Sequence, residues 1–208
     1  MITTKLVIFD LDGTIIRNST AAQAISLAAG TLPEVQLLEA EYHAGHIDSL
    51  QFSLRALELW GPDHLTYFSD AWASAPKIDD LDAAISGLRS LGIVTCLLTM
   101  APEEFARLVG NFDHIHGSQY GTKILNPEDK PRIAAQIQAA IGADDDDVVA
   151  LGDSASDAPL FTKYTRTIAV NATQDLLVLA RHPYSGSSVM DALALEVDLP
   201  HNQGHRAA

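Results

Sequence analysis

The most constraining feature of this sequence is a short apolar run that ends in two closely spaced carboxylates. Leu6 to Phe9 is an unbroken run of apolar residues, which is typical of a central strand buried on both faces of a parallel sheet. Asp10 and Asp12 follow within the sequence Asp-Leu-Asp-Gly-Thr. Residues two apart on an extended chain point the same way, so both carboxylates are expected to face one point beyond the strand. Open α/β sheets bind their ligands at that edge.

Apolar runs and amphipathic segments alternate through the remainder of the chain. Strands are expected at 93–98, 112–116, 147–151 and 167–170, and helices at 79–90, 102–109, 129–141, 173–180 and 187–195. Such alternation places the strands side by side and covers both faces of the sheet with helices. The sequence therefore predicts an α/β protein with a doubly wound parallel sheet. Residues 201–208 are expected to form a frayed tail.

Residues 17–76 have a different pattern, with four short helical segments and no strand-like run between them. The first crossover of an α/β core rarely needs about sixty residues. We therefore expect residues 17–76 to form a small helical domain inserted after the first strand. Residues 1–16 and 77–208 would then build the α/β core. An enlarged first crossover is the alternative.

Composition and charge narrow the classes of function. The 208 residues are 47% hydrophobic and 19% charged, as in an ordinary globular protein. A formal net charge of −14 repels a nucleic-acid backbone, so no nucleic acid is expected as a partner. The one cysteine, Cys96, excludes an intrachain disulfide. We recognise no signal peptide and no membrane span, and the expected location is cytoplasmic.

Oxygen-bearing side chains follow three of the expected buried strands. Asp10 and Asp12 follow the first, Thr99 ends the second, and Asp153 follows the third, with Asp157 one helical turn later. Because the carboxyl ends of parallel strands meet at one edge of a sheet, we expect these side chains to gather in one crevice. Carboxylate oxygens are the ligands that Mg²⁺ prefers. We therefore predict a Mg²⁺ site formed by Asp10, Asp12, Asp153 and Asp157.

The hydrolysis of a phosphate ester would give the first two carboxylates distinct roles. Such a reaction needs an in-line nucleophile, neutralisation of the phosphate oxygens and a proton for the leaving alkoxide. We expect Asp10 to attack phosphorus and form an aspartyl-phosphate. Asp12 would protonate the leaving oxygen and later take a proton from the hydrolytic water.

A second group of residues is suited to holding the phosphate. We expect the Thr99 hydroxyl, the Lys130 ammonium and the loop N–H groups at Gly13 and Met100 to bind its equatorial oxygens. Lys123 is the alternative cation. Lys130 is preferred because it starts a predicted helix, which places it at the N-terminal end that faces the site.

The order and spacing of these segments resemble a known family, the haloacid dehalogenase-like (HAD) phosphohydrolases. The matching segments are Asp10-Leu11-Asp12-Gly13-Thr14, the strand that ends in Thr99, Lys130, and Gly152-Asp153-Ser154-Ala155-Ser156-Asp157. The resemblance covers nearly the whole chain. It implies a Rossmann-like core and the aspartyl-phosphate mechanism.

The resemblance also gives residues 17–76 a role, because members of this family carry a helical C1-type cap at that position. Such a cap closes over the site and selects the substrate. The segment from Gly45 to Arg55 is similar to the arginine-bearing cap segment of phosphoserine phosphatase and its relatives, so Arg55 is the candidate substrate ligand. The alternative is an ordinary arginine on a helix surface. Ser19 stands where those enzymes have a glutamate that pairs with the substrate ammonium.

The sequence therefore predicts a Mg²⁺-dependent phosphatase that acts on a small phosphorylated metabolite. The serine at position 19 favours a sugar phosphate or another small polar alcohol phosphate over phosphoserine. A phosphoserine or phospho-amino-acid phosphatase, a phosphoglucomutase-like phosphotransferase and a binding protein without turnover are the alternatives. A dehalogenase is disfavoured because Asp12 would have no role in it. We expect no membrane partner, and a monomer or a homodimer.

Overall fold

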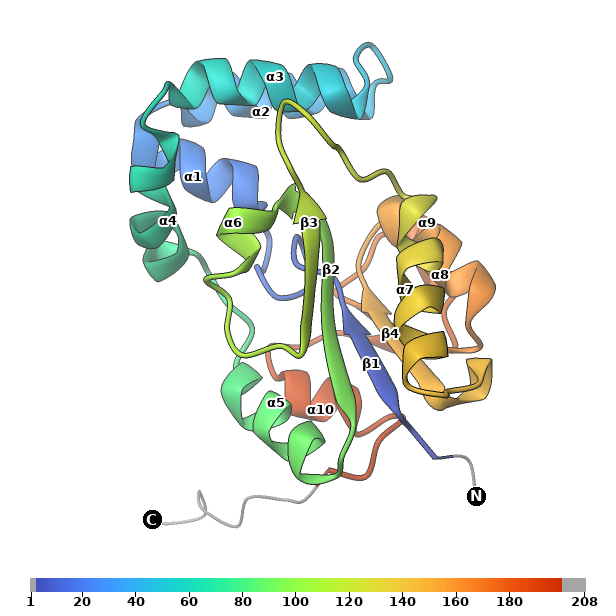
Figure 1. Cartoon of the computed structure of the whole chain (residues 1–208). Coiled ribbons are helices and arrows are strands. Elements are labelled where there is room, and N and C mark those ends of the chain that lie inside the picture. The colour runs from blue at the N-terminus through green and yellow to red at the C-terminus, as the bar shows by residue number, and fades with distance from the viewer. Residues whose placement is uncertain (1–2, 200–208) are drawn as a thin grey trace.

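The computed structural model describes residues 3–199, and its centre is a single parallel sheet (Figure 1). Six strands lie in the order β3-β2-β1-β4-β5-β6. Their bounds are Leu6–Phe9 for β1, Val94–Pro102 for β2, His114–Ser118 for β3, Val148–Gly152 for β4, Arg166–Val170 for β5 and His182–Tyr184 for β6. The predicted α/β class and doubly wound parallel sheet are confirmed.

The sheet is covered by helices on both faces. One face carries α7 (Asp129–Ala140), α8 (Ala158–Lys163) and α9 (Gln174–Leu177), whereas α5 (Leu81–Ser90) and α10 (Val189–Leu193) lie on the other (Figure 1). A short helix, α6 (Glu103–Ala106), follows β2, and single 3₁₀ turns lie at Asp145–Asp147 and Ala155–Asp157. No helix within residues 3–199 has the length and apolar character needed to cross a membrane.

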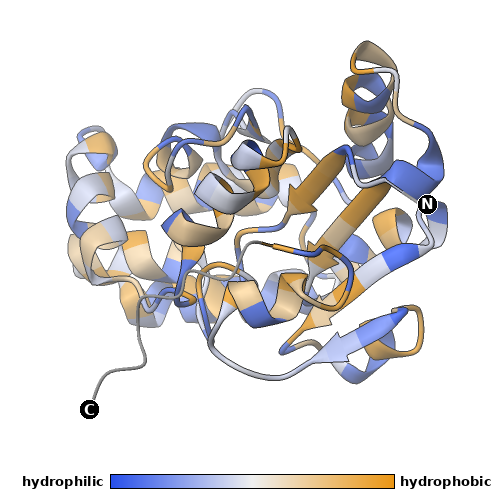
Figure 2. Ribbon diagram, turned by 90° about the horizontal axis from the view of Figure 1, so that it is seen from below, coloured by the Kyte–Doolittle hydropathy of each residue, from blue (hydrophilic) through white to orange (hydrophobic). Residues whose placement is uncertain are grey.

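The first strand occupies the middle of the sheet because its side chains are apolar on both faces. Leu6 pairs with Val94 of β2 and with Val148 of β4. Leu6 and Ile8 belong to the apolar cluster under α7 and α8, whereas Val7 and Phe9 belong to the cluster on the opposite face. All four side chains of β1 are fully buried, and the central strands form the hydrophobic band in Figure 2.

The segment between β1 and β2 contains only helices before α5. They are α1 (Ala21–Ala29), α2 (Leu32–His43), α3 (Ser49–Trp60), a 3₁₀ turn at His64–Tyr67 and α4 (Phe68–Ser74). Thr20 caps α1 by accepting a hydrogen bond from the Gln23 N–H, and Asp48 forms a capping box with Gln51 at the start of α3. These helices gather at one end of the sheet, at the top left of Figure 1.

The chain enters and leaves this helical segment at adjacent points. The Arg17 N–H donates to the Pro76 carbonyl at 2.7 Å, and the Ile78 N–H donates to the Ile15 carbonyl at 2.8 Å. Phe68 of α4 packs edge-on against Phe105 of α6, with ring centroids 5.6 Å apart. The adjacent crossings are consistent with a boundary near residues 16 and 77. The division into a cap (17–76) and a core (1–16 and 77–208) stays a proposal.

Three elements differ from the sequence-based expectations. The helix predicted at 102–109 is shorter: α6 starts one residue later because β2 continues to Pro102, and it ends at Ala106. The strand predicted at 112–116 forms two residues later, as β3. A sixth strand, β6, was not predicted, because His-Pro-Tyr lacks an apolar run; its proline is tolerated at the sheet edge. The tail predicted at 201–208 lies outside the described residues.

Candidate active site

Asp10 lies directly after the central strand, where the sheet geometry places its carboxyl at the ligand-binding edge. Its backbone N–H donates to the Leu151 carbonyl of β4 at 3.1 Å, which continues the β1–β4 pairing by one residue. The Asp10 side chain is only 4% exposed. A carboxyl buried to this degree needs a cationic or hydrogen-bonding partner.

That partner is Lys130, in the first turn of α7. Its side chain is fully buried, and its Nζ lies 2.7 Å from Asp10 Oδ1 and 2.7 Å from Asp157 Oδ1. The Ser156 hydroxyl is a third, longer contact at 3.5 Å. The two carboxyls raise the pKa of Lys130 against the opposing effect of burial, so the ammonium stays charged. The competing candidate, Lys123, is exposed.

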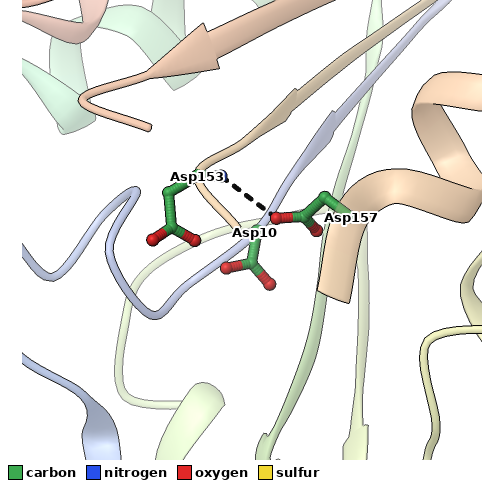
Figure 3. A group of neighbouring side chains, drawn as sticks. All are labelled: Asp10, Asp153 and Asp157. Carbon is green, nitrogen blue, oxygen red and sulfur yellow. Dashed lines mark hydrogen bonds between the residues drawn. The ribbon is translucent and has the colours of Figure 1, made fainter. Parts of the chain in front are cut away.

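Asp153 and Asp157 come from the turn between β4 and α8. Asp157 is fully buried, and its Oδ2 accepts the Asp153 N–H at 3.1 Å. Figure 3 shows the carboxyls of Asp10, Asp153 and Asp157 facing one another at the ends of the strands. One oxygen from each lies within 4.8 Å of the others. The structure therefore brings together three of the four predicted metal ligands.

The donor set fits a hard divalent cation, although its members are not equivalent. Asp153 Oδ1 is buried and has no hydrogen-bond partner among residues 3–199, so this oxygen fits the role of a cation ligand. Asp10 Oδ1 accepts a hydrogen bond from Lys130, whereas the second Asp10 oxygen does not contact this lysine. Both Asp157 oxygens already accept hydrogen bonds. Asp10 and Asp153 are thus the carboxyls best placed to bind a metal directly, with Asp157 orienting Lys130 and the Asp153 loop.

Asp12 faces the same cavity but is not part of this group of three. Its Oδ1 accepts the Ala21 N–H at the start of α1, at 2.6 Å. Burial and the neighbouring Asp10 charge raise the pKa of Asp12 to about 7, partly offset by the hydrogen bond from Ala21. A carboxyl with a pKa near neutrality can both donate and accept a proton.

Burial dominates the electrostatics of the other two carboxyls as well. Burial and the Asp157 charge raise the pKa of Asp10 to about 8, and Lys130 opposes the rise. Burial, again with Asp157, raises the pKa of Asp153 to about 7. Lys130 alone does not neutralise this concentration of carboxyls. A bound divalent cation would lower these pKa values and favour the ionised nucleophile.

Gly13 is required by the turn that joins Asp12 to the rest of the site. Its φ is +78°, a conformation that L-residues with side chains rarely adopt. A β-carbon at this position would lie 1.9 Å from Asp153 Oδ2. The glycine therefore allows the backbone after β1 to pack directly against the Asp153 carboxyl.

A cavity of about 440 Å³ opens above these carboxyls. Its floor carries Asp10, Asp12, Gly13, Thr99, Met100 and Asp153, and side chains of α1, α2 and α3 form the facing wall. Thr99 is almost fully buried, and its hydroxyl oxygen accepts the Ala101 N–H at 3.0 Å. The predicted phosphate-binding residues Gly13, Thr99 and Met100 thus line the cavity. Lys130 lies behind Asp10.

The two predicted cap residues behave differently. Ser19 lines the cavity, and its hydroxyl donates to Gln23 Oε1 at 3.2 Å. Arg55 is exposed and forms a bidentate ion pair with Glu41 of α2, and it does not line the cavity. This arrangement corresponds to the surface-helix alternative for Arg55.

Sequence reasoning missed Glu39, a buried carboxylate of α2 that lines the cavity. Its signal was present: the buried positions of α2 are Val35, Leu38 and Glu39, which are spaced as one helix face. A glutamate on the apolar face of a helix is an exception to the pattern and therefore a candidate for function.

Comparison with known proteins agrees with this geometry. A model of the haloacid dehalogenase-like hydrolase family matches residues 4–163. The chain belongs to this family. The match includes the turn after β1, the helical segment, Lys130 and the Asp153 loop. No curated protein matches the chain.

Solved HAD structures share the fold at low sequence identity. A phospho-aspartyl intermediate analogue of phosphoserine phosphatase is 20% identical, with a TM-score of 0.77 and coverage of 93% of this chain and 99% of that one. A substrate-bound phosphoserine phosphatase complex gives the same TM-score and identity, over 93% and 98%. A HAD family hydrolase from Salmonella enterica serovar Typhi is 16% identical, with a TM-score of 0.81, over 94% of this chain and 72% of its own.

The family match confirms the predicted family and its hydrolase class, and the shared fold confirms the Rossmann-like core. The phosphatase activity stays a prediction. The metal, the intermediate, the substrate, the role of each site residue and the cytoplasmic location stay predictions.

Proposed function

We propose that this protein is a Mg²⁺-dependent phosphatase that hydrolyses a small phosphomonoester through phosphorylated Asp10. The observation that carries the proposal is the buried arrangement of Asp10 and Asp153 on the floor of one cavity, with Lys130 bound to Asp10. It provides a nucleophile, a fixed cation and an unpartnered carboxylate oxygen in one place. The cavity volume of about 440 Å³ suits a small metabolite.

In the first half-reaction, one oxygen of the ionised Asp10 carboxylate attacks phosphorus. The new O–P bond forms as the bond from phosphorus to the leaving alcohol breaks, and Asp12 gives its proton to the departing oxygen. The Ala21 N–H holds Asp12 for this transfer at 2.6 Å. The wall formed by α1, α2 and α3 limits the access of water to the reacting phosphate.

In the second half-reaction, water attacks phosphorus and the bond to Asp10 breaks. Asp12, now ionised, takes the proton of that water, so the site returns to its starting state with inorganic phosphate released. Lys130 keeps Asp10 oriented throughout, because Asp157 holds its ammonium from the opposite side at 2.7 Å.

Asp10 and Asp153 would hold the Mg²⁺, which supplies positive charge against the phosphate oxygens. The buried, unpartnered Asp153 Oδ1 supports this assignment. Thr99 and the loop N–H groups at Gly13 and Met100 would contact the remaining phosphate oxygens.

The test is phosphate release from a panel of small esters, including an aryl phosphate, with Mg²⁺ and with a chelator. We expect turnover that depends on the metal and needs no bisphosphate activator, which separates a hydrolase from a phosphoglucomutase-like transferase. Asp10→Asn should reduce kcat by at least about a thousandfold, because the amide cannot act as the nucleophile. Substantial residual activity in a correctly folded variant would exclude Asp10 as the nucleophile.

A further inference from the structure

The wall of the cavity opposite the reacting groups contains a buried carboxylate that has no cationic partner in the described part of the chain. Glu39 of α2 is 9% exposed. The Thr20 hydroxyl donates to Glu39 Oε1 at 2.6 Å, and the Gln23 amide donates to Oε2. No lysine or arginine of residues 3–199 forms an ion pair with it, whereas Glu41, two residues further along α2, is paired with Arg55.

The hydrogen bonds around Glu39 fix its partners as donors. The Thr20 oxygen already accepts the Gln23 N–H as the N-cap of α1, so its hydroxyl hydrogen is directed to Glu39. The Ser19 hydroxyl donates to Gln23 Oε1, which leaves the amide nitrogen of Gln23 to face Glu39. The network therefore presents Glu39 as an acceptor and supplies no positive charge.

Glu39 lies a short distance from the reacting end of the cavity. The first turn of α1 joins the two, because the Ala21 N–H binds Asp12 and the neighbouring Thr20 hydroxyl binds Glu39. A small substrate whose phosphate rests on Asp10 therefore extends its alcohol portion toward Glu39. Asp10, Asp12 and Glu39 line the same cavity.

The charge of the cavity lining limits which charged groups the alcohol portion of the substrate can carry. Four carboxylate side chains line the cavity, and the described lining contains neither lysine nor arginine. Lys130 contacts Asp10, and a bound cation would face Asp10 and Asp153, but neither compensates the charge of Glu39. Tyr42, Phe52 and Tyr120 also line the cavity, and aromatic faces attract ammonium groups.

We propose that Glu39 selects phosphomonoesters whose alcohol carries an ammonium group and no carboxylate, with phosphoethanolamine as the simplest member of the class. This inference rests on the proposed function. The ammonium provides the charge that Glu39 lacks. A carboxylate on the same alcohol, as in phosphoserine, would be repelled by the Glu39 carboxylate. The described lining offers no lysine or arginine to bind it. Arg55 is paired with Glu41 and does not line the cavity.

The competing explanation is that Glu39 only ties α1 to α2. A comparison of phosphoethanolamine with ethylene glycol monophosphate separates the two explanations, because these esters have nearly the same shape and differ in charge. We expect the wild-type kcat/KM to be roughly 10- to 100-fold higher for phosphoethanolamine, as for other charge-assisted contacts in a partly buried site. Phosphoserine should be hydrolysed less efficiently than phosphoethanolamine.

The variant Glu39→Gln removes the charge and keeps one hydrogen-bond acceptor. It should bring the kcat/KM for the two isosteric esters to within about threefold of each other, mainly through a higher KM for phosphoethanolamine. Glu41→Gln on the same helix is the matched control and should leave the wild-type preference intact. An equal loss for both esters in Glu39→Gln would identify a structural role and overturn the inference.

Binding measured without turnover keeps the two proposals distinguishable. Calorimetric titration of the Asp10→Asn protein with Mg²⁺ and each ester should give a lower Kd for phosphoethanolamine, and this preference should be lost when Glu39→Gln is added. Equal Kd values for both esters would refute the role of Glu39, whatever the activity. Failure to hydrolyse any ester, the aryl phosphate included, with the binding preference retained, would instead refute the proposed phosphatase function alone.

Discussion

At the scale of single residues, the site depends on a buried cation held between two carboxyls. Lys130 contacts Asp10 and Asp157 at equal distances of 2.7 Å, and none of the three side chains is more than 5% exposed. The sequence predicted the type and the order of these residues. It did not show that Asp157 binds Lys130, because that contact depends on how the turn after β4 packs against the first turn of α7.

Replacing this lysine tests its role directly. Lys130→Met should abolish turnover and lower the free energy of unfolding by about 3–5 kcal/mol, because two buried carboxyls would then share no cation. Urea denaturation and phosphate release would measure the two effects. Lys123→Met is the matched control, since Lys123 is exposed and should leave both quantities nearly unchanged. Loss of activity in Lys123→Met instead would favour the alternative phosphate ligand.

Arg55 offers a second test at this scale. Its guanidinium is held by Glu41 on the outer surface of the helical segment, and exposed pairs of this kind contribute about 0–1 kcal/mol. We expect Arg55→Ala to leave KM and kcat within about twofold of wild type for every ester that is hydrolysed. A KM that rises tenfold or more would show that Arg55 reaches the substrate during the catalytic cycle.

At the scale of elements, the turn after β1 joins the sheet to the helical segment and to the metal-binding loop. Gly13 lies against the Asp153 carboxyl, and the Gly13 N–H donates to the Ser19 carbonyl at 3.3 Å. The start of α1 then binds both Asp12 and Glu39 through consecutive residues. A change in this turn is therefore expected to affect both ends of the cavity.

Gly13→Ala tests the turn, with Gly142→Ala as its control. Both glycines have a positive φ, but a β-carbon at Gly142 would meet no atom within 4 Å. The control should lose about 1–2 kcal/mol of stability from backbone strain alone and keep its activity. Gly13→Ala should lose more stability and nearly all activity, because Asp153 must move. Thermal denaturation and phosphate release would measure the difference, and equal behaviour would contradict the close packing.

At the scale of the whole molecule, the folded state concentrates carboxyls whose pKa values are raised to about 7 to 8. In the unfolded chain an aspartate titrates near its ordinary value of about 3.9. At pH values between these two pKa ranges, the folded protein binds more protons than the unfolded chain. Its stability without metal should therefore fall as the pH rises and should level off above about pH 8.

The melting temperature in a chelator should accordingly be higher at pH 6 than at pH 8.5, and Mg²⁺ should raise it most at the higher pH. This window lies above the range in which surface carboxyls with lowered pKa values, such as Asp113 and Asp129, titrate. Asp10→Asn should flatten the dependence, because one of the raised carboxyls is removed. A melting temperature that rises from pH 6 to 8.5 without metal would contradict the assignment.

The fold and the catalytic floor of the site were predictable because their signals are local. An apolar strand followed by Asp10 and Asp12, and another followed by Asp153, identify the ends of parallel strands whatever the rest of the chain does. The edge strand β6 was missed because its pairing with β5, rather than its composition, makes it a strand.

The substrate-facing wall was decided only by the tertiary structure. Glu39 and Glu41 are two residues apart on α2, and a helix turns by about 200° over two residues, so the two side chains face opposite sides. The spacing of Glu39 from Val35 and Leu38 makes it a candidate, but the sequence does not show what that face of the helix packs against. The packing of α2 against α1 and α3 directs Glu39 into the cavity and leaves Glu41 outside with Arg55, because only one face of the helix can be buried.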